Sequence, residues 1–304
     1  MLVITGAAGF IGWNLYQSLK HLRDVILVDY GEQFTDLSPT HEVMDPLEFL
    51  EKMNTASFAS NIEIVFHQGA CSDTLCKDPH HMMQQNFDYS HELFNRCLQY
   101  GVKLIYASSA SVYGDGVASE SSPMTPKNLY ANSKRIFDDY VTTFLSNTKV
   151  EYPQIVGLRY FNVYGPGEER KGRMASVACQ FKKQIDESNK INIFAGSENF
   201  MRDFIFIDDV VEINKHFANN PKISGIFNCG TGVASPFTAI PETMKPHYNF
   251  ETIEISMPEN IITSYQKFTK ADTNKLTSVG GYKRPFHSLS AGMEKYIKYW
   301  KGHQ

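Results

Sequence analysis

The sequence predicts an α/β fold: a doubly wound parallel sheet with a smaller, discontinuous C-terminal domain. Short apolar runs alternate with helical patterns over the first 160 residues, and this alternation is typical of parallel sheets with helices on both faces. A glycine-rich turn follows the first apolar run, and a carboxylate follows the second. After Pro166 the alternation is lost, which indicates a second structural unit.

The N-terminal elements are predicted to be a strand at 2–5, a helix, and a strand at 25–28. The helix carries apolar residues at Ile11, Leu15, Leu19 and Leu22. The turn before it reads Gly6-x-x-Gly9-x-x-Gly12, and such glycines let backbone N–H groups approach a pyrophosphate at the positive end of a helix. Asp29 ends the second strand, where a carboxylate binds a dinucleotide ribose. A Rossmann-type dinucleotide site is therefore predicted, the alternative being a tight turn without a ligand.

The next elements continue the alternation. Strands are predicted at 61–66, 102–107 and 155–160, helices at 82–100 (stopped by Gly101) and 130–145, and a proline-containing loop at 121–128. The segment Gln68-Gly69-Ala70-Cys71-Ser72 leaves the carboxyl end of the third strand. Open α/β sheets bind ligands at such ends, so this segment is expected to line the same site.

The C-terminal part mixes short elements. A charged loop is predicted at 168–173, helices at 174–185 and 291–300, and a strand at 191–194. Apolar runs at 204–207 and 225–228 are expected to return to the main sheet or its flank. The dinucleotide-binding domain is therefore placed at 1–164 and 204–232, and the second domain at 165–203 and 233–304.

The composition argues against several classes of protein. A net charge of −4 shows no basic excess for nucleic acid or an anionic membrane. No apolar run reaches the roughly 18 residues that span a bilayer, and the N-terminus lacks the basic region of a signal peptide. The five cysteines form no CxxC pair and no Cys/His metal spacing. We expect a cytoplasmic homo-oligomer with reduced cysteines, no metal, and no nucleic-acid or membrane partner.

Tyr130 and Lys134 are candidate catalytic residues. Four residues apart, they lie one turn from each other on a helix, and an ammonium near a phenol lowers the phenol pKa toward that of a general base. Ser109 follows the preceding apolar strand, where it could hold a substrate hydroxyl beside the tyrosine. Tyr16 and Lys20 have the same spacing in another context, and we interpret that pair as a solvated helix face.

The glycine pattern, Ser109 and Tyr130-x-x-x-Lys134, in this order, resemble the extended short-chain dehydrogenase/reductase superfamily. Segments 159–166, 171–178, 196–204 and 265–272 more closely resemble the family of ADP-L-glycero-D-manno-heptose 6-epimerases, and the similarity covers nearly the whole chain. That family inverts C6″ of an ADP-heptose for lipopolysaccharide core biosynthesis. Its cofactor removes hydride from C6″ and returns it to the other face, so acid/base groups are needed on two sides.

The resemblance implies a set of site residues. Tyr130 and Lys171 would be the two acid/base residues, Ser109 would hold the reacting oxygen, and Lys134 would also bond the nicotinamide ribose. The implied cofactor contacts are Gly6, Gly9, Phe10, Ile11, Gly12, Asp29, Tyr30, Gln68, Gly69, Ala70, Cys71, Ser72, Gln85, Asn86, Tyr130, Lys134 and Lys171. The implied contacts with the ADP-sugar substrate are Ser109, Asn162, Arg173, Gln180, Phe194, Ala195, Gly196, Ser197, Arg202 and Tyr265.

Two of these residues have structural alternatives. Lys171 can be a surface lysine of a charged loop; in a catalytic role, enclosure and the like charges of two neighbouring arginines would lower its pKa. Arg202 suits a pyrophosphate because a guanidinium matches phosphate oxygens bidentately. The alternative for Arg202 is a structural ion pair with Asp203 or Asp208.

The sequence departs from the family pattern at two positions, so substrates other than an ADP-heptose remain as alternatives. Arg173 stands where the family has a small hydroxyl residue, and Gln180 stands where it has a histidine. The alternative enzymes are another nucleotide-sugar epimerase, such as a 4-epimerase, or a 4,6-dehydratase. The dehydratase branch carries acidic residues beside the serine, where this chain has Ala110 and Ser111. A non-catalytic dinucleotide sensor would have no use for an intact serine, tyrosine and lysine.

The cofactor is predicted to be one nicotinamide dinucleotide per subunit, tightly bound. Asp29 is followed by a tyrosine, a glycine and a glutamate, and no lysine occurs between Lys20 and Lys52. A carboxylate without basic neighbours favours NAD, whereas the family resemblance favours NADP.

Overall fold

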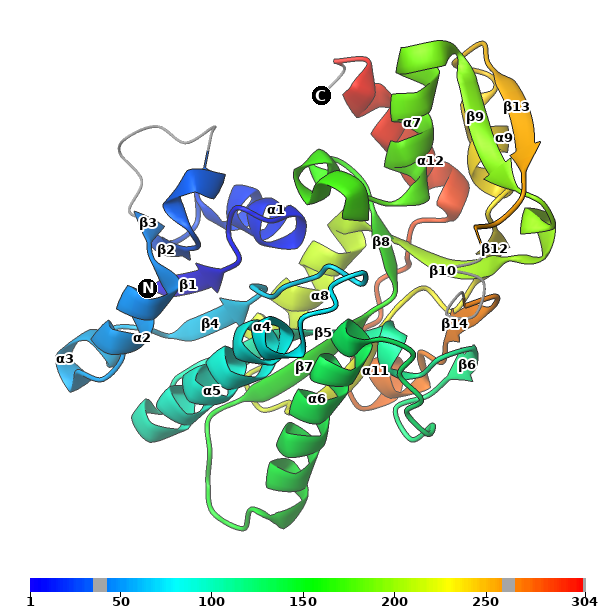
Figure 1. Ribbon diagram of the computed structural model, residues 1–304. Coiled ribbons are helices and arrows are strands. Elements are labelled where there is room, and N and C mark those ends of the chain that lie inside the picture. Colours follow the sequence, from blue (N-terminus) through cyan, green and yellow to red (C-terminus); the bar gives the residue numbers. More distant parts are fainter. Residues whose placement is uncertain (35–42, 259–265, 303–304) are drawn as a thin grey trace.

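The structure, a computed structural model, describes residues 1–34, 43–258 and 266–302. Its centre is a seven-stranded sheet in the order β11-β7-β5-β4-β1-β2-β3 (Figure 1), and all neighbouring strands in it are parallel. The strands are β1 (Leu2–Thr5), β2 (Val25–Val28), β3 (Val43–Met44), β4 (Ile64–His67), β5 (Lys103–Ser109), β7 (Ile155–Tyr160) and β11 (Gly225–Cys229). The predicted α/β fold class is confirmed.

Helices cover both faces of this sheet because successive strand residues point to opposite sides. Leu2 and Ile4 join the hydrophobic core on one face, and Val3 between them joins the core on the other. The first core includes residues of α1 (Phe10–Leu19) and α8 (Ile207–Asn219), and it extends into the C-terminal part of the chain. The second core includes residues of α2 (Pro46–Lys52), α3 (Ala56–Ala59), α5 (Tyr89–Tyr100) and α6 (Leu129–Asn147). Figure 1 shows α5 and α6 on the same face.

The helix predicted at 82–100 consists of three consecutive segments. α4 (Pro79–Met83) begins after Asp78, whose carboxylate caps it, and a π-helical turn (Gln84–Asp88) connects it to α5. Gly101, with φ of +70°, ends α5 as predicted. The π turn carries Gln85, which lines the cavity described below.

The C-terminal part contributes small sheets and further helices. The strands are β8 (Asn162–Tyr164), β10 (Met201–Phe206) and β12 (Ala234–Pro236) in one sheet, β9 (Lys190–Phe194) with β13 (Glu251–Ile255), and β6 (Gly116–Ala118) with β14 (Thr269–Ala271). The helices are α7 (Val177–Ser188), α9 (Ala239–Met244), α11 (Asn274–Ser278) and α12 (Leu289–Trp300). Figure 1 shows α7, α12, β9 and β13 gathered at one end of the molecule. Within the described ranges, no helix combines the length and apolar character of a membrane span.

Two predictions about the first helix were wrong. Leu22 lies beyond the end of α1 and is 67% exposed, because the chain leaves the helix after Leu19. Tyr16, predicted to be on a solvated face, is only 4% exposed and belongs to the core. Its partner Lys20 is exposed, as predicted.

Two boundaries after residue 166 also differ. The charged loop is a 3₁₀ segment (Glu168–Met174) broken at Gly172, where φ is +55°, and α7 therefore begins at Val177 rather than at 174. The strand predicted at 204–207 is β10, which pairs with β8 and β12 beside the main sheet and passes directly into α8. The run at 225–228 does return to the main sheet, as β11.

Candidate active site

A cavity of about 1650 Å³ opens where the strand order reverses between β1 and β4, at their carboxyl ends. Open α/β sheets bind ligands at such a reversal. The cavity brings together most of the predicted site residues, namely Gly6, Gly9, Phe10, Ile11, Gly12, Asp29, Tyr30, Gln68, Gly69, Ala70, Cys71, Ser72, Gln85, Ser109, Tyr130, Lys134, Asn162, Lys171, Arg173, Gln180, Phe194 and Arg202.

The glycine turn forms one end of the cavity. Gly6 has φ of +66°, and a β-carbon on it would lie 2.5 Å from the backbone of Gly69. A β-carbon on Gly12 would lie 2.2 Å from the carbonyl oxygen of Gly6. The backbones of the turn, α1 and the segment after β4 therefore meet closely. No side chain caps α1 at Gly9, which leaves N-terminal N–H groups of this helix for an anion.

Asp29 lies at the carboxyl end of β2, beside the turn. Its Oδ2 accepts a 2.9 Å hydrogen bond from the backbone N–H of Ala8, and its Oδ1 accepts one of 2.9 Å from that of Tyr30. Burial raises the pKa of Asp29, and the two hydrogen bonds oppose that shift. The carboxylate is thereby fixed where a dinucleotide ribose is expected.

Ser109, Tyr130 and Lys134 line the same cavity from β5 and α6. Asn128 caps α6, so Tyr130 lies in its first turn. Burial raises the pKa of Tyr130, and a hydrogen bond with Ser109 opposes that shift. The predicted lowering of this pKa by Lys134 was wrong: the Nζ atom of Lys134 donates a 3.0 Å hydrogen bond to the carbonyl of Ala107 instead, and burial dominates.

A buried carboxylate supports the charge of Lys134. Burial lowers the pKa of Lys134 to about 8, and the carboxylate of Asp138, one turn further along α6, opposes that shift. Asp138 accepts hydrogen bonds from Tyr106 Oη at 3.0 Å, Ser108 Oγ at 2.8 Å and Arg159 Nε at 2.7 Å. Its position is therefore set by β5 and β7 as well as by its own helix.

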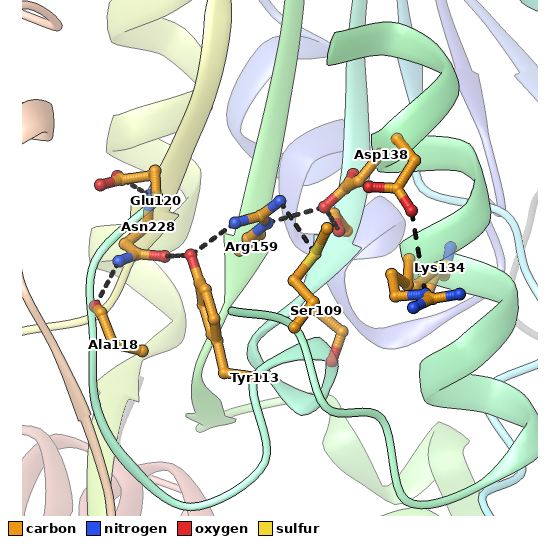
Figure 2. Close-up of polar contacts among 12 residues, drawn as sticks. Ser109, Tyr113, Ala118, Glu120, Lys134, Asp138, Arg159 and Asn228 are labelled. Carbon is orange, nitrogen blue, oxygen red and sulfur yellow. Dashed lines mark hydrogen bonds and ion pairs between the residues drawn. The ribbon is translucent and has the colours of Figure 1, made fainter. Parts of the chain in front are cut away.

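The polar contacts continue away from Asp138 through the interior (Figure 2). Arg159 Nη1 donates a 2.7 Å hydrogen bond to Tyr113 Oη, which donates one of 2.7 Å to Asn228 Oδ1. The backbone N–H of Asn228 donates to Glu120 at 2.6 Å. This chain of contacts ties β7 and β11 to the segment that follows Ser109.

Lys171 enters the cavity from the 3₁₀ segment. Its Nζ atom lies 5.8 Å from the ring centroid of Phe10, beside the glycine turn. Burial lowers the pKa of Lys171, and the carboxylate of Glu168 opposes that shift. The predicted effect of neighbouring arginines is not among the causes of this shift; the guanidinium of Arg170 lies 4.4 Å from the ring centroid of Trp13.

Arg173 and Gln180, the two departures from the family pattern, lie together at the rim. Arg173 keeps 68% of its side chain exposed and forms an ion pair with Asp73. Thr74 Oγ1 donates to Met174 Sδ at 3.7 Å, so the loop after β4 is joined twice to the 3₁₀ segment. Gln180 Nε2 donates 3.4 Å hydrogen bonds to two carbonyl groups of that segment.

Arg202 in β10 is 6% exposed and lines a further part of the cavity. Its guanidinium lies 5.2 Å from the ring centroid of Phe237, and Nη1 donates a 3.0 Å hydrogen bond to the carbonyl of Met201. Asp203 accepts from three backbone N–H groups, and Asp208 pairs with a lysine of α12 at 3.0 Å. These contacts occupy both aspartates and lend no support to the alternative ion pairs for Arg202.

Four of the predicted contacts within the described residues do not line the cavity. Asn86 is fully buried, and its side chain accepts from Cys71 N at 2.7 Å and donates to Ser133 Oγ at 2.9 Å, so it supports the wall from behind. Tyr265 lies outside the described residues. The other three, which follow Phe194 in the chain, are Ala195, Gly196 and Ser197. Their roles stay predictions.

Sequence reasoning missed several residues of the site. Tyr89, Phe237 and Thr269 line the cavity, but nothing in their local sequence distinguishes them from ordinary core positions. Asp138 did have a signal, because it stands four residues after Lys134, a spacing that places an acid beside an ammonium on a helix.

Comparison with known proteins adds independent information. Residues 2–230 match the model of the NAD dependent epimerase/dehydratase family. The chain is 43% identical to ADP-L-glycero-D-manno-heptose-6-epimerase of Brachyspira hyodysenteriae, over 98% of this chain and 97% of that protein.

Solved structures share the fold over nearly the full length. The crystal structure of Helicobacter pylori ADP-L-glycero-D-manno-heptose-6-epimerase is similar with a TM-score of 0.83 and 28% identity, over 98% of this chain and 95% of that one. MoeE5 in complex with UDP-glucuronic acid and NAD is similar with a TM-score of 0.81 and 26% identity, over 100% and 99% of the two chains.

Proposed function

This chain belongs to the NAD dependent epimerase/dehydratase family, and on that premise we propose the reaction that it catalyses. It is an isomerase, an ADP-heptose 6-epimerase that converts ADP-D-glycero-D-manno-heptose into ADP-L-glycero-D-manno-heptose. One observation carries the assignment: a single cavity joins the glycine turn, the wall of Ser109, Tyr130 and Lys134, and the buried Arg202. The glycine turn would hold the dinucleotide, the wall of Ser109, Tyr130 and Lys134 would hold the reacting sugar carbon, and Arg202 would hold the pyrophosphate of the substrate. These three places are adjacent in the one cavity.

The residues present fit a nicotinamide dinucleotide, and we assign NAD as the cofactor. The uncapped start of α1 and the close approach of Gly6 to Gly69 suit a pyrophosphate. Asp29 suits the free hydroxyls of a ribose, and its carboxylate would repel a 2′-phosphate. The similar protein MoeE5 binds NAD.

The chemistry assigned to the first half of the reaction uses Ser109, Tyr130 and Lys134. A bound NAD supplies reversible hydride transfer at C6″. Ser109 would hold the 6″-oxygen, and Tyr130 would take its proton as general base. The hydrogen bond with Ser109 opposes the effect of burial on the pKa of Tyr130, and Lys134 would bond the nicotinamide ribose.

Inversion also needs a proton carrier on the other side of the sugar, and Lys171 is our candidate. It reaches the cavity from the 3₁₀ segment rather than from α6. Its pKa is lowered by burial, which suits a group that exchanges a proton near neutral pH. The surface-lysine alternative fits less well, because the side chain is partly buried in the cavity.

We assign a different ligand to each of the two domains. Residues 1–164 and 204–232 would bind the dinucleotide, and residues 165–203 and 233–304 would bind the ADP-sugar. Arg202 would contact the pyrophosphate of the substrate, because its buried guanidinium lines the cavity.

The decisive experiment incubates the purified protein with ADP-D-glycero-D-manno-heptose and separates the two epimers. We expect the L-glycero epimer to form without net reduction of cofactor and without added stoichiometric cofactor, because hydride leaves and returns within one turnover. Steady accumulation of reduced cofactor would instead indicate a dehydrogenase, and loss of water from the sugar would indicate a dehydratase. Conversion of a UDP-hexose alone would indicate a 4-epimerase, and binding without turnover a sensor.

A further inference from the structure

A fully buried carboxylate lies in the segment that carries Lys171. Glu168 is the first residue of the 3₁₀ segment and is 0% exposed. Burying a carboxylate is unfavourable unless hydrogen bonds or a cation compensate its charge. The groups that compensate Glu168 therefore indicate what this carboxylate does.

The carboxylate of Glu168 joins the two ends of one stretch of chain. At one end, the backbone N–H and the Oγ atom of Ser176 donate 2.7 Å hydrogen bonds to Oε2 and Oε1. At the other end, the backbone N–H of Gly165 donates a longer hydrogen bond of 3.4 Å to Oε1. The chain from 165 to 176 is thereby closed into a loop, and Lys171 lies near the middle of that loop.

The closed loop also contacts two helices. The carbonyl of Pro166 accepts a 3.0 Å hydrogen bond from Asn14 Nδ2 in α1. Tyr296 of α12 is 0% exposed, and its Oη atom donates a 3.4 Å hydrogen bond to Glu169 Oε1. Contacts inside the loop and outside it thus determine where Lys171 enters the cavity.

Glu168 also provides a negative charge that acts on Lys171. Burial lowers the pKa of Lys171; the carboxylate of Glu168 opposes this shift most strongly, followed by Cys179 in α7. Burial in turn raises the pKa of Glu168, and the hydrogen bonds from Ser176 oppose that shift. Tyr296 and the ammonium of Lys171 oppose it as well. The lysine and the glutamate therefore each stabilise the charged form of the other.

We propose that Glu168 is the positioning residue of Lys171: its carboxylate closes the loop from 165 to 176 and keeps the ammonium in the cavity. The inference rests on the proposed function, in which Lys171 exchanges a proton on one side of the sugar, and deepens it. Glu168 is fully buried and does not line the cavity, so it acts through Lys171 rather than on the substrate. Loss of its carboxylate should impair only the half of the reaction that uses Lys171.

The test follows each half of the reaction separately. One pure epimer of the ADP-heptose is added to the protein loaded with NAD. Oxidation at C6″ then transfers hydride to NAD, and the proton of the 6″-hydroxyl passes to a base. In a two-base site the two epimers use different bases, so the rate of NAD reduction from each epimer reports on one base. Lys171→Met identifies the epimer that depends on Lys171.

Glu168→Gln keeps the size of the side chain, removes its charge, and replaces one accepting oxygen with a nitrogen that cannot accept a hydrogen bond. We expect NAD reduction to slow about tenfold from the epimer that depends on Lys171, less than the 10²–10⁴-fold cost of losing an acid–base group itself. The rate from the other epimer should stay native. Glu169→Gln is the matched control, because Glu169 is exposed and outside the cavity. Both epimers should react at the native rate in that variant.

Trypsin gives a second readout that needs no substrate. The loop contains three cleavage sites, at Arg170, Lys171 and Arg173, and cleavage of a folded segment requires its local opening. Glu168→Gln loses a buried hydrogen bond, so cleavage in the loop should be about fivefold faster than in the native protein. Glu169→Gln should be cleaved at the native rate, and mass spectrometry of the fragments locates each cut.

Three results in Glu168→Gln would overturn the positioning role of Glu168. They are equal slowing from both epimers, which is a general structural effect, native rates from both epimers, and cleavage of the loop at the native rate. Should Glu168→Gln not fold, Ser176→Ala would be judged by the same criteria, because it removes a hydrogen bond to the same carboxylate and keeps the charge.

Failure of the proposed function gives different results. A native protein that reduces no NAD with either epimer would contradict the epimerase activity. Native rates from both epimers in Lys171→Met would contradict the second base, and the role of Glu168 would fall with it. Selective slowing in Lys171→Met without selective slowing in Glu168→Gln would overturn the role of Glu168 alone.

Discussion

Asp138 and Arg159 form a 2.7 Å ion pair in which the side chains are 0% and 3% exposed. Removing one partner of such a pair leaves an uncompensated buried charge. The carboxylate is also the negative group that opposes the effect of burial on the pKa of Lys134. The pair therefore links the stability of the sheet to the charge of a residue in the candidate active site.

Asp138→Asn should shift the alkaline limit of activity to lower pH. The carboxylate raises the pKa of Lys134, which burial has lowered to about 8, so without it the ammonium would lose its proton below pH 8. The variant should also lose about 3–5 kcal/mol of stability. The measurements are the pH profile of kcat/KM and urea unfolding.

Ser108→Ala is the control for this prediction, because it removes a 2.8 Å hydrogen bond to the same carboxylate and keeps the charge. Its alkaline limit should match that of the native protein. An unchanged limit in folded Asp138→Asn would mean that Asp138 does not act through Lys134.

Tyr130→Phe should lower turnover by about 10²–10⁴-fold, the usual contribution of general acid–base catalysis. The ring stays in place, so affinity for the dinucleotide should be retained. Tyr16→Phe is the control, since Tyr16 has the same spacing to a lysine but lies in α1 and is buried in the core. Rapid-quench turnover and NAD titration measure both effects, and near-native turnover in Tyr130→Phe would remove Tyr130 from the mechanism.

Lys171→Met should slow epimerisation severely and leave ADP-sugar affinity within about tenfold, or about 1.4 kcal/mol. The reason is that methionine keeps the side-chain volume and loses the proton. A 6″-aldehyde analogue gives the sharper measurement, because in a two-base site Lys171→Met and Tyr130→Phe should impair opposite C6″ stereochemistries. Lys183 is the control, because it lies on the exposed face of α7 with 70% of its side chain accessible. Lys183→Met should neither slow epimerisation nor impair reaction with either C6″ stereochemistry. Epimerisation at the native rate in Lys171→Met would place the second base elsewhere.

NAD should bind at least as tightly as NADP, and Asp29→Ala should relax the preference toward NADP. The carboxylate of Asp29 would meet the 2′-phosphate, whereas alanine carries no charge. Because Asp29 also accepts hydrogen bonds from Ala8 and Tyr30, some loss of affinity for both cofactors is expected. The ratio of the two dissociation constants is therefore the quantity to measure, and a clear NADP preference in the native protein would contradict the assignment.

The fold and one side of the site could be predicted from sequence because local patterns determine them. The apolar runs that became β1, β2, β5 and β7 were recognisable from composition and length. The Gly6 turn was recognisable because backbone contact with Gly69 leaves no room for a β-carbon. These features depend on residues close together in the chain, or on a single steric requirement.

The remainder depended on contacts between distant segments. The pairing of Thr269 with Gly116 joins positions more than 150 residues apart, and no periodicity in either segment indicates it. The pKa of Tyr130 could not be predicted from its spacing to Lys134, because it depends on how deeply β5 and α6 bury the phenol. The hydrogen bond from Lys134 Nζ to the carbonyl of Ala107 could not be predicted from that spacing either.

The pairing of β6 with β14 also has a consequence for the order of synthesis on the ribosome. The main sheet cannot be completed before β11 has emerged, because β11 ends at Cys229 and pairs with β7. The strand that holds Thr269 emerges some 40 residues later, and its pairing with β6 joins positions more than 150 residues apart, which is entropically unfavourable. A nascent chain thus exposes every strand of its main sheet before it exposes the strand that carries Thr269, so this side of the cavity is completed last.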